Sequence, residues 1–339
     1  MHKQGHNPSL INQMFQQAIG LHQKGMLIEA QRIYEQILKL QPKNFNVLDL
    51  LATISAQNKR FEEAVDLWSK AIKCNSNDAA TFSNRGLALH ELKKFEAAIA
   101  SYDQAIKIKP DFVQAYYNRG NTLKEIKQFE NAIASYDHAI KIKPDYVQAY
   151  YNRGNTLKEI KQFEQAIINY NKAISLKPDN AEAYNNLGLA LQKLKQYDQA
   201  IINHNKAISL KPDNAEAYNN LGLALQKLKQ YDLAIVNYNK AISLKPDKAD
   251  AYNNLGFLFD ELKKVDQAMI CYQKALNIKP DFAEAYNNLG GLLSELKRYD
   301  EALIQFNQSI NINPEIDFLP TIYQRNGKLK YAIMSKYQT

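Results

Sequence analysis

The feature that most constrains this chain is a long segment that occurs twice. Residues 181–198 read AEAYNNLGLALQKLKQYD, and residues 215–232 read the same, thirty-four positions later. Self-similarity at a fixed period of this length predicts an array of structural repeats, each packed only against its neighbours. Because one such repeat cannot bury its own apolar side chains, we expect the stacking of repeats to stabilise the fold.

The period extends over most of the 339 residues, and a Pro-Asp pair near the end of most repeats sets the boundaries. We predict an N-terminal extension at 1–10, repeats within 11–316, and a C-terminal tail at 317–339 that could form a capping helix. The nine predicted repeats are 11–44, 45–78, 79–112, 113–146, 147–180, 181–214, 215–248, 249–282 and 283–316.

Two helices are predicted in each repeat, whose residues we number from position 1 to position 34. Apolar and small residues recur at positions 4, 8 and 11 and again at positions 20, 24 and 27. Each set has the i, i+4, i+7 spacing of one helix face. The short connection predicts a helical hairpin, and proline at position 32 ends the second helix in most repeats. Glycine at position 8 and alanine at position 20 predict a close crossing of the two helices.

Composition narrows the function classes. The chain has 45% hydrophobic and 23% charged residues and a formal net charge of +8. Its lysines recur at the same few positions of each repeat, which favours a solvated face over a nucleic-acid-binding one. We therefore expect a cytoplasmic protein with no membrane span, no nucleic-acid partner, no cofactor and no metal site. Cys74 and Cys271 are expected to be buried and reduced, and the absence of catalytic motifs predicts that the chain is not an enzyme.

The repeat resembles the tetratricopeptide (TPR) repeat. An aromatic residue at position 4, glycine at 8, alanine at 20, tyrosine or phenylalanine at 24, alanine at 27 and proline at 32 carry the resemblance, which covers residues 11–316. The first two repeats depart from it, with Ala18 and Ala52 at position 8. The resemblance implies an all-α fold, a right-handed superhelix whose first helices line a concave groove, and a scaffold for peptides or partner proteins.

A row of asparagines is the strongest candidate for a binding surface. Asparagine occupies position 6 in seven consecutive repeats, and its amide can both donate and accept hydrogen bonds. We expect either that the row binds the backbone of an extended peptide in the groove, or that it satisfies neighbouring groups in the fold. The residues are Asn84, Asn118, Asn152, Asn186, Asn220, Asn254 and Asn288.

Further groove-lining residues are expected at positions 2, 5, 9 and 12. The fourth and fifth repeats offer Tyr117, Tyr151, Asn121, Asn155, Lys124 and Lys158, whereas the later repeats offer Glu182, Glu216, Asp250, Glu284 and Asp260. This change of charge favours a basic partner toward the C-terminal half. The alternative is that these residues only form solvated helix faces.

Two readings of the function remain open. The first is a non-catalytic protein–protein interaction scaffold that binds extended peptides. The second is a detached substrate-recognition arm, because the asparagine row also resembles that of the TPR arm of O-GlcNAc-transferase-like glycosyltransferases. The second reading implies association with a separate glycosyltransferase. For the chain itself we expect a monomer or weak self-association.

Overall fold

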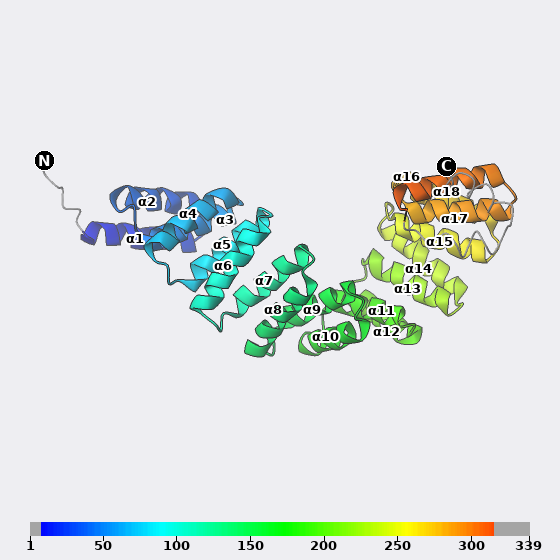
Figure 1. Cartoon of the computed structure of the whole chain (residues 1–339), viewed down its shortest axis with the longest axis horizontal. Helices are drawn as coiled ribbons and strands as arrows, with labels where there is room; N and C mark the ends of the chain where they lie inside the picture. Colours follow the sequence, from blue (N-terminus) through cyan, green and yellow to red (C-terminus); the bar gives the residue numbers. More distant parts are fainter. Residues whose placement is uncertain (1–7, 315–339) are drawn as a thin grey trace. The chain divides into compact units, whose positions relative to one another are not determined.

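The computed structural model describes residues 8–314 (Figure 1). Within this range the chain forms eighteen α-helices and no β-strand, so the predicted all-α fold class of paired helices is confirmed. The chain divides into two compact units, Met1–Leu176 and Lys177–Thr339, called unit 1 and unit 2 below. The predicted tail at 317–339 lies outside the described residues.

Unit 1 contains five helical hairpins within its described residues, 8–176. Its first hairpin begins at Pro8, ahead of the predicted start at residue 11, and from α3 onward each first helix begins at position 1 and each second helix at position 17. The helices are α1 (Pro8–Gln23), α2 (Leu27–Leu40), α3 (Phe45–Gln57), α4 (Phe61–Cys74), α5 (Ala79–Glu91), α6 (Phe95–Ile108), α7 (Val113–Glu125), α8 (Phe129–Ile142), α9 (Val147–Glu159) and α10 (Phe163–Leu176).

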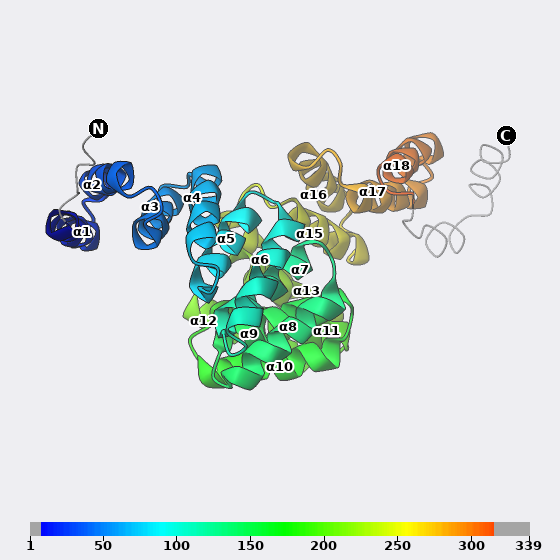
Figure 2. The ribbon, with the colours of Figure 1, turned by 60° about the vertical axis from the view of Figure 1, so that its left-hand side comes forward.

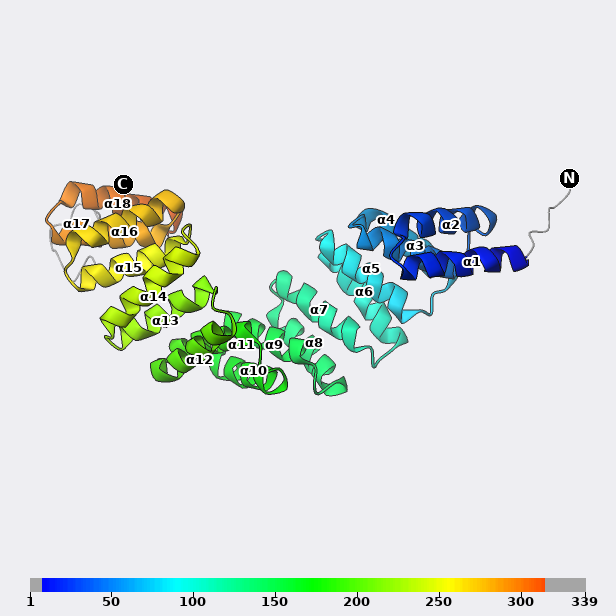
Figure 3. The same ribbon diagram turned by 180° about the vertical axis from the view of Figure 1, so that it is seen from behind.

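Unit 2 contains four hairpins in its described part. The two helices of a hairpin lie side by side, as Figures 2 and 3 show for α17 and α18. Each second helix also packs against the first helix of the next hairpin, and neighbouring first helices touch one another. The helices are α11 (Ala181–Lys193), α12 (Tyr197–Leu210), α13 (Ala215–Lys227), α14 (Tyr231–Leu244), α15 (Ala249–Glu261), α16 (Val265–Ile278), α17 (Ala283–Glu295) and α18 (Tyr299–Ile312).

Lysine at position 15 shapes the turn inside the hairpins. In the sixth repeat the Lys195 and Gln196 N–H groups donate to the carbonyls of Gln192 and Leu191, both at 2.9 Å, which closes the end of α11. This geometry needs a left-handed residue, where glycine is usual. Here lysine takes it, with φ between 57° and 62°, at Lys59, Lys93, Lys127, Lys161, Lys195, Lys229, Lys263 and Lys297.

The core of each hairpin is built around the residue at position 24. Tyr102 and Tyr238 occupy this position and are fully buried. A Cβ atom at Gly86 would lie 2.6 Å from Cε1 of Tyr102, and one at Gly222 would lie 2.8 Å from the Tyr238 ring. The prediction that glycine at position 8 serves the crossing with alanine at position 20 is therefore wrong in its cause, because the glycine makes room for the aromatic ring.

Two other expectations concern single residues and membranes. Cys271 is buried and its burial raises the pKa of the thiol to about 11, but Cys74 is exposed at the end of α4, so the prediction that both cysteines are buried is wrong for Cys74. No helix in residues 8–314 is long and apolar enough to cross a membrane. No cluster of three or more metal-ligating side chains occurs in the same range.

Candidate functional site

The asparagines at position 6 of unit 2 form hydrogen bonds from repeat to repeat. Asn254 donates from Nδ2 to Oδ1 of Asn219 at 3.1 Å, and Asn288 donates to Asn253 at 3.0 Å. Asn220 makes the same bond to Asn185 at 3.2 Å. We call this series of position-6 to position-5 bonds the amide ladder. It arises because neighbouring first helices touch, which brings position 6 of one repeat against position 5 of the repeat before it.

Unit 1 builds the corresponding contact from different residues. Asn152 donates from Nδ2 to the Tyr117 hydroxyl and to Oδ1 of Asn121, both at 2.9 Å. Asn121 Oδ1 also accepts from the hydroxyl of the buried Tyr136 at 2.8 Å. Tyrosine at position 5 and asparagine at position 9 thus replace the single asparagine at position 5.

The remaining predicted asparagines differ in their surroundings. Asn118 accepts from Gln114 Nε2 at 2.8 Å on an exposed surface, while Asn84 and Asn186 are half-buried. Asn220 is only 4% exposed. The bonds of Asn152, Asn220, Asn254 and Asn288 go to other repeats, so these four asparagines join neighbouring repeats, and binding of a peptide by the row stays a prediction. Each of these bonds uses the amide nitrogen, so the carbonyl oxygen is not consumed by the ladder.

Position 5 was expected to line the groove, and in much of the chain it does not. Asn185, Asn219 and Asn253 are 7%, 5% and 2% exposed, and Ser83 is equally buried. The burial of the three asparagines follows from the ladder, because each is bonded to the asparagine at position 6 of the next repeat. Tyr117 and Tyr151 are larger and remain half-buried.

The other predicted groove residues lie at least partly open to solvent. Lys124, Lys158 and Asn155 are half-buried, and Asn155 accepts from the Tyr170 hydroxyl at 2.8 Å. The Tyr117 ring lies 5.1 Å from the Tyr146 ring, and burial of Tyr146 raises its pKa to about 12.

Among the acidic residues of unit 2, Glu182, Glu216, Asp250 and Glu284 are all exposed, and Glu216 forms an ion pair with Lys248. Although the Glu284 side chain keeps contact with solvent, desolvation by the surrounding chain raises the pKa of its carboxyl group. The charge of Asp250 raises it further. Two carboxylates at position 2 of successive repeats therefore repel each other, and a cation between them would relieve this repulsion.

A second polar chain orients a carboxylate on the same side of unit 2. The buried Tyr238 hydroxyl donates to Oε1 of Gln226 at 2.8 Å, and Gln226 donates from Nε2 to Oε2 of Glu261 at 2.5 Å. In the preceding repeat the buried His204 takes the place of the tyrosine, with its ring nitrogens 2.8 Å from Gln192 Nε2 and 3.0 Å from Asn185 Oδ1. Burial lowers the pKa of His204 to about 4.

Glu261 contributes to a cavity of about 280 Å³ between α15 and α17. Phe257 lies at its edge with 39% of its surface exposed. Gly291 forms part of the wall, and a Cβ atom there would have no neighbour within 4 Å. The cavity exists because position 9 is glycine here, whereas the sixth and seventh repeats have Leu189 and Leu223. The lining residues are Phe257, Asp260, Glu261, Lys263, Asn287, Asn288 and Gly291.

The charges and polar atoms of this cavity favour a cationic group. Asp260 and Glu261 bring two carboxylates, while the Lys263 ammonium group is paired with Glu295 at 3.0 Å. Oδ1 of Asn287 is buried and has no hydrogen-bond partner within residues 8–314. A buried carbonyl without a partner is unusual and is satisfied when a donor enters. An aromatic ring beside carboxylates suits the side chain of arginine or lysine.

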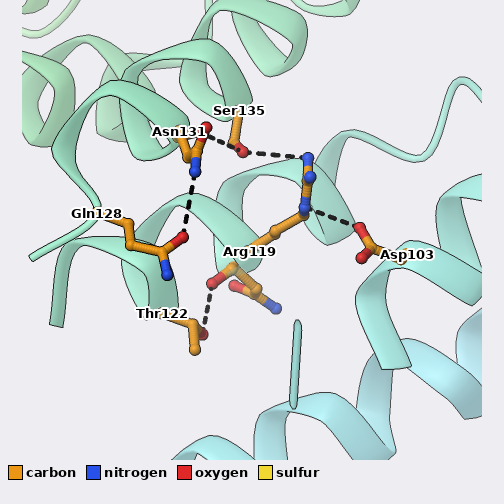
Figure 4. Close-up of polar contacts among 7 residues, drawn as sticks. Asp103, Arg119, Thr122, Gln128, Asn131 and Ser135 are labelled. Carbon is orange, nitrogen blue, oxygen red and sulfur yellow. Dashed lines mark hydrogen bonds and ion pairs between the residues drawn. The ribbon is translucent and has the colours of Figure 1, made fainter. Parts of the chain in front are cut away.

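A polar contact of unit 1 joins successive repeats by charge (Figure 4). Arg119, at position 7, forms an ion pair from Nε to Asp103 at 2.8 Å and donates from Nη1 to Ser135 Oγ at 3.3 Å. Arg153 repeats the ion pair with Asp137 at 2.9 Å. These two ion pairs join a first helix to the second helix of the preceding repeat.

Sequence reasoning missed the cavity, and the signal was present. Position 9 was expected to line the groove through Asn121 and Asn155, but the space that phenylalanine followed by glycine opens at this position in the eighth and ninth repeats was not anticipated. The unpaired Asn287 carbonyl could not have been found in this way, because asparagine at position 5 is common to the sixth to ninth repeats and is satisfied in three of them.

Among solved structures with similar folds, the APC/C hetero-tetramer Cut9-Hcn1 has a TM-score of 0.56 at 20% identity, covering 79% of this chain and 52% of that chain. A tetratricopeptide repeat protein from Parabacteroides merdae has a TM-score of 0.54 at 18% identity, covering 74% of this chain and 98% of that one. YrrB, described as a TPR protein with an unusual peptide-binding site, is 27% identical with a TM-score of 0.46, covering 54% and 95% of the two chains. No curated protein sequence matches this chain.

Family profiles match along most of the array. A profile described as TPR repeat matches residues 86–127, 120–161, 154–195 and 193–229. Two profiles described as tetratricopeptide repeat match 215–248 and 249–282 in one case and 271–304 in the other. The matched residues run from 86 to 304, which is more than half of the chain, and the described helices have the same hairpin order. The chain therefore belongs to the tetratricopeptide repeat family.

Proposed function

We propose that this chain is a non-catalytic protein-binding scaffold that holds an extended peptide segment carrying arginine or lysine against the first helices of unit 2. The cavity between α15 and α17 is the observation that carries the proposal. It combines an exposed aromatic ring at Phe257, the carboxylates of Asp260 and Glu261, and the unpaired carbonyl of Asn287. A basic side chain supplies the positive charge, the N–H donors and the apolar stem that these groups bind.

The position of the acids supports a cation rather than a neutral ligand. Glu261 is oriented by Gln226, which is itself held by the Tyr238 hydroxyl, so the carboxylate is in place before a ligand arrives. Preorganised groups lose little conformational entropy on binding. Asp250 and Glu284 form a second acidic site on the same two helices, α15 and α17. Asn287 lines both the first cavity and a neighbouring cavity beside Glu284.

The amide ladder has a supporting role in this proposal. Its asparagines use their amide nitrogens to join repeats, and we expect the carbonyl oxygens of Asn254 and Asn288 to accept from the backbone of the bound segment. Several such bonds, each contributing about 0.5–1.5 kcal/mol, would hold a peptide with little regard to its sequence. The basic side chain in the cavity would then fix the register.

The test is a peptide-array screen followed by binding titrations, in which arginine-containing peptides are compared with the same peptides carrying citrulline. Gly291→Leu is the informative variant, because it fills the cavity with the residue that Leu189 and Leu223 place at the same position, and leucine favours a helix more than glycine by about 1 kcal/mol. We expect this variant and Glu261→Gln to weaken binding about ten-fold or more.

Asp300→Asn is the matched control, because it removes one negative charge from an exposed residue of α18 that does not line the cavity. We expect this variant to bind the peptide like the wild type. Equal affinity for the arginine and citrulline peptides, or unchanged binding by Gly291→Leu, would reject the proposal. The association with a glycosyltransferase that the resemblance implies stays a prediction.

A further inference from the structure

The second helices of unit 2 carry a row of exposed aliphatic side chains. The residues occupy position 22, two residues from both the buried alanine at position 20 and the buried side chain at position 24. They therefore point about 200° around the helix from each of these core residues, on the opposite side. The row consists of Ile202, Val236, Ile270 and Ile304, which are 68%, 63%, 56% and 56% exposed.

Each of the first three residues of this row, Ile202, Val236 and Ile270, lies between an acidic and a basic residue on the same helix face. In α14, Asp232 precedes Val236 by four residues and Lys240 follows it by four. Four residues is about one helical turn, so the three side chains follow one another along one face. The same order occurs as Asp198, Ile202, Lys206 in α12 and as Asp266, Ile270, Lys274 in α16. The outer face thus has an acidic edge, an apolar centre and a basic edge.

Helix α14 is the most apolar point of this face. Leu233, 54% exposed, adds a second aliphatic side chain one turn from Val236. Asp232 and Lys240 are both exposed, and neither forms an ion pair within the described residues 8–314. Lys274 of α16, by contrast, lies 5.6 Å from the Tyr252 ring. Exposed apolar patches that are rimmed by polar residues are typical of contact surfaces.

We propose that this outer face of unit 2 binds a second copy of the chain, with α14 of each copy packed antiparallel about a two-fold axis. Charge complementarity selects this occupant. A two-fold axis through the Val236 pair brings Asp232 of each copy opposite Lys240 of the other, because both lie four residues from the centre. Leu233 of one copy then contacts Val236 and the stem of Lys240 of the other.

Other occupants fit the charges less well. An anionic lipid surface would attract the lysine edge but repel the acidic edge, which runs through all four second helices as Asp198, Asp232, Asp266 and Asp300. A partner of a single charge sign meets the same conflict. Only a surface with both edges in reverse order satisfies the pattern, and the chain itself has that surface. This inference goes beyond the peptide-binding proposal and does not rest on it.

The size of the contact predicts its strength. One pair of antiparallel helices buries less than the roughly 1,200 Å² of a standard stable interface. We therefore expect association that depends on protein concentration, measured by sedimentation velocity or by light scattering over a concentration series. A complete absence of association in the wild type at high concentration would overturn the inference.

The variants follow from the two-fold geometry. Leu233→Gln combined with Val236→Gln should weaken association at least about ten-fold, while Ile28→Gln, which changes a 67% exposed side chain in unit 1, should leave it unchanged. All three substituted side chains are exposed, so circular dichroism should show an unchanged fold. Association that persists in the double variant would overturn the inference.

Charge reversal tests the pairing directly. Asp232→Lys and Lys240→Asp should each weaken self-association, because each places like charges opposite one another. A mixture of the two single variants should associate more strongly than either alone, and a chain carrying both changes should recover. Failure of the mixture to associate would contradict the two-fold arrangement. Cosedimentation with phosphatidylserine vesicles that requires Val236 would overturn the inference in favour of a lipid surface.

Discussion

The repeats at 113–180 and those at 181–248 have the same order of helices, but they satisfy the buried tyrosine hydroxyl with different hydrogen-bond partners. In the earlier pair, position 5 is tyrosine and position 9 is asparagine, and the Tyr136 hydroxyl donates to Asn121. In the later pair, position 5 is asparagine and position 9 is leucine, and the Tyr238 hydroxyl donates instead to Gln226 at position 12. The buried tyrosine is the same, but its partner moves by three residues along the first helix.

Position 7 shows the same kind of alternative. Arg119 and Arg153 bond to an aspartate of the preceding repeat, whereas Leu187 and Leu221 are buried at 4% exposure. The comparison teaches that positions 5, 7, 9 and 12 differ together between the two regions, and that the side chains at 5, 9 and 12 are hydrogen-bond partners of the buried tyrosine or of the asparagine at position 6. Exchanging one of these residues between the two regions should therefore cost stability, and exchanging its partner as well should restore it.

The largest effect on folding stability is expected at His204, which occupies position 24, where the neighbouring repeats have tyrosine. Its pKa of about 4 lies below the ordinary value of 6.5, so below pH 6.5 the unfolded state binds the proton more readily than the folded state. Stability is therefore lost as pH falls toward 4, by roughly 3 kcal/mol for this group. Urea unfolding at a series of pH values should show that His204→Tyr removes this loss.

The reciprocal change provides the control for that measurement. Tyr238→His gives the seventh repeat the residue of the sixth, and it should add a similar loss of stability at low pH. If His204→Tyr and the wild type lose stability in parallel between pH 7 and pH 4, the histidine is not the group responsible.

The next effect concerns the exchange of position 5. Asn219→Tyr introduces the tyrosine of the earlier pair at a site that is 5% exposed and removes the acceptor of Asn254, so we expect a loss of about 2 kcal/mol. Adding Leu223→Asn recreates the partner that Asn121 provides in the earlier pair, and it should recover at least half of the loss. A double-mutant cycle with no coupling would show that the two positions are independent.

A smaller effect is expected from removing single hydroxyl groups. Tyr238→Phe leaves the buried Gln226 without its donor and should cost about 1–2 kcal/mol in thermal or chemical unfolding. Tyr272 is the matched comparison, since its hydroxyl is buried and has no partner among the described residues. Tyr272→Phe should therefore be neutral or slightly stabilising, and an equal cost at both positions would contradict the assignment.

The smallest effect should be the same in both regions, because the hairpin turn does not differ between them. Lys161 and Lys195 both have a φ of 60°, and glycine relieves the strain of this conformation while adding freedom to the unfolded chain. We expect Lys161→Gly and Lys195→Gly each to raise the free energy of unfolding by about 0.5 kcal/mol. A clear difference between them would mean that the regions differ in more than their polar side chains.

The all-α class could be predicted from the sequence because periodicity and proline placement are local signals. Ala200 and His204 lie on one helix stripe whatever the partner helix is, and the structure buries both. The reason for the glycine at position 8 was missed, since the clash of a Cβ atom with the Tyr102 ring depends on the packing of two helices. That contact is not visible in the spacing of either helix alone.

The candidate site was predicted less completely, for a physical reason. An asparagine row such as Asn254 and Asn288 has the same composition whether it faces a ligand or a neighbouring repeat, and only the distance to Asn219 and Asn253 decides. The cavity at Gly291 depends on the missing side chain at position 9 of the ninth repeat. Periodicity describes what repeats share, whereas this site arises where a repeat differs.

The amide ladder bears on how such a chain can change in length. Each rung joins a donor at position 6 to an acceptor at position 5 of the repeat before it, and a copied segment inherits both groups. A tandem duplication therefore inserts a newcomer that already matches its neighbours on either side, without a round of compensating mutations. Gene duplication could in this way lengthen the protein in single steps, and selection would afterwards act on the few sites where the copies have diverged.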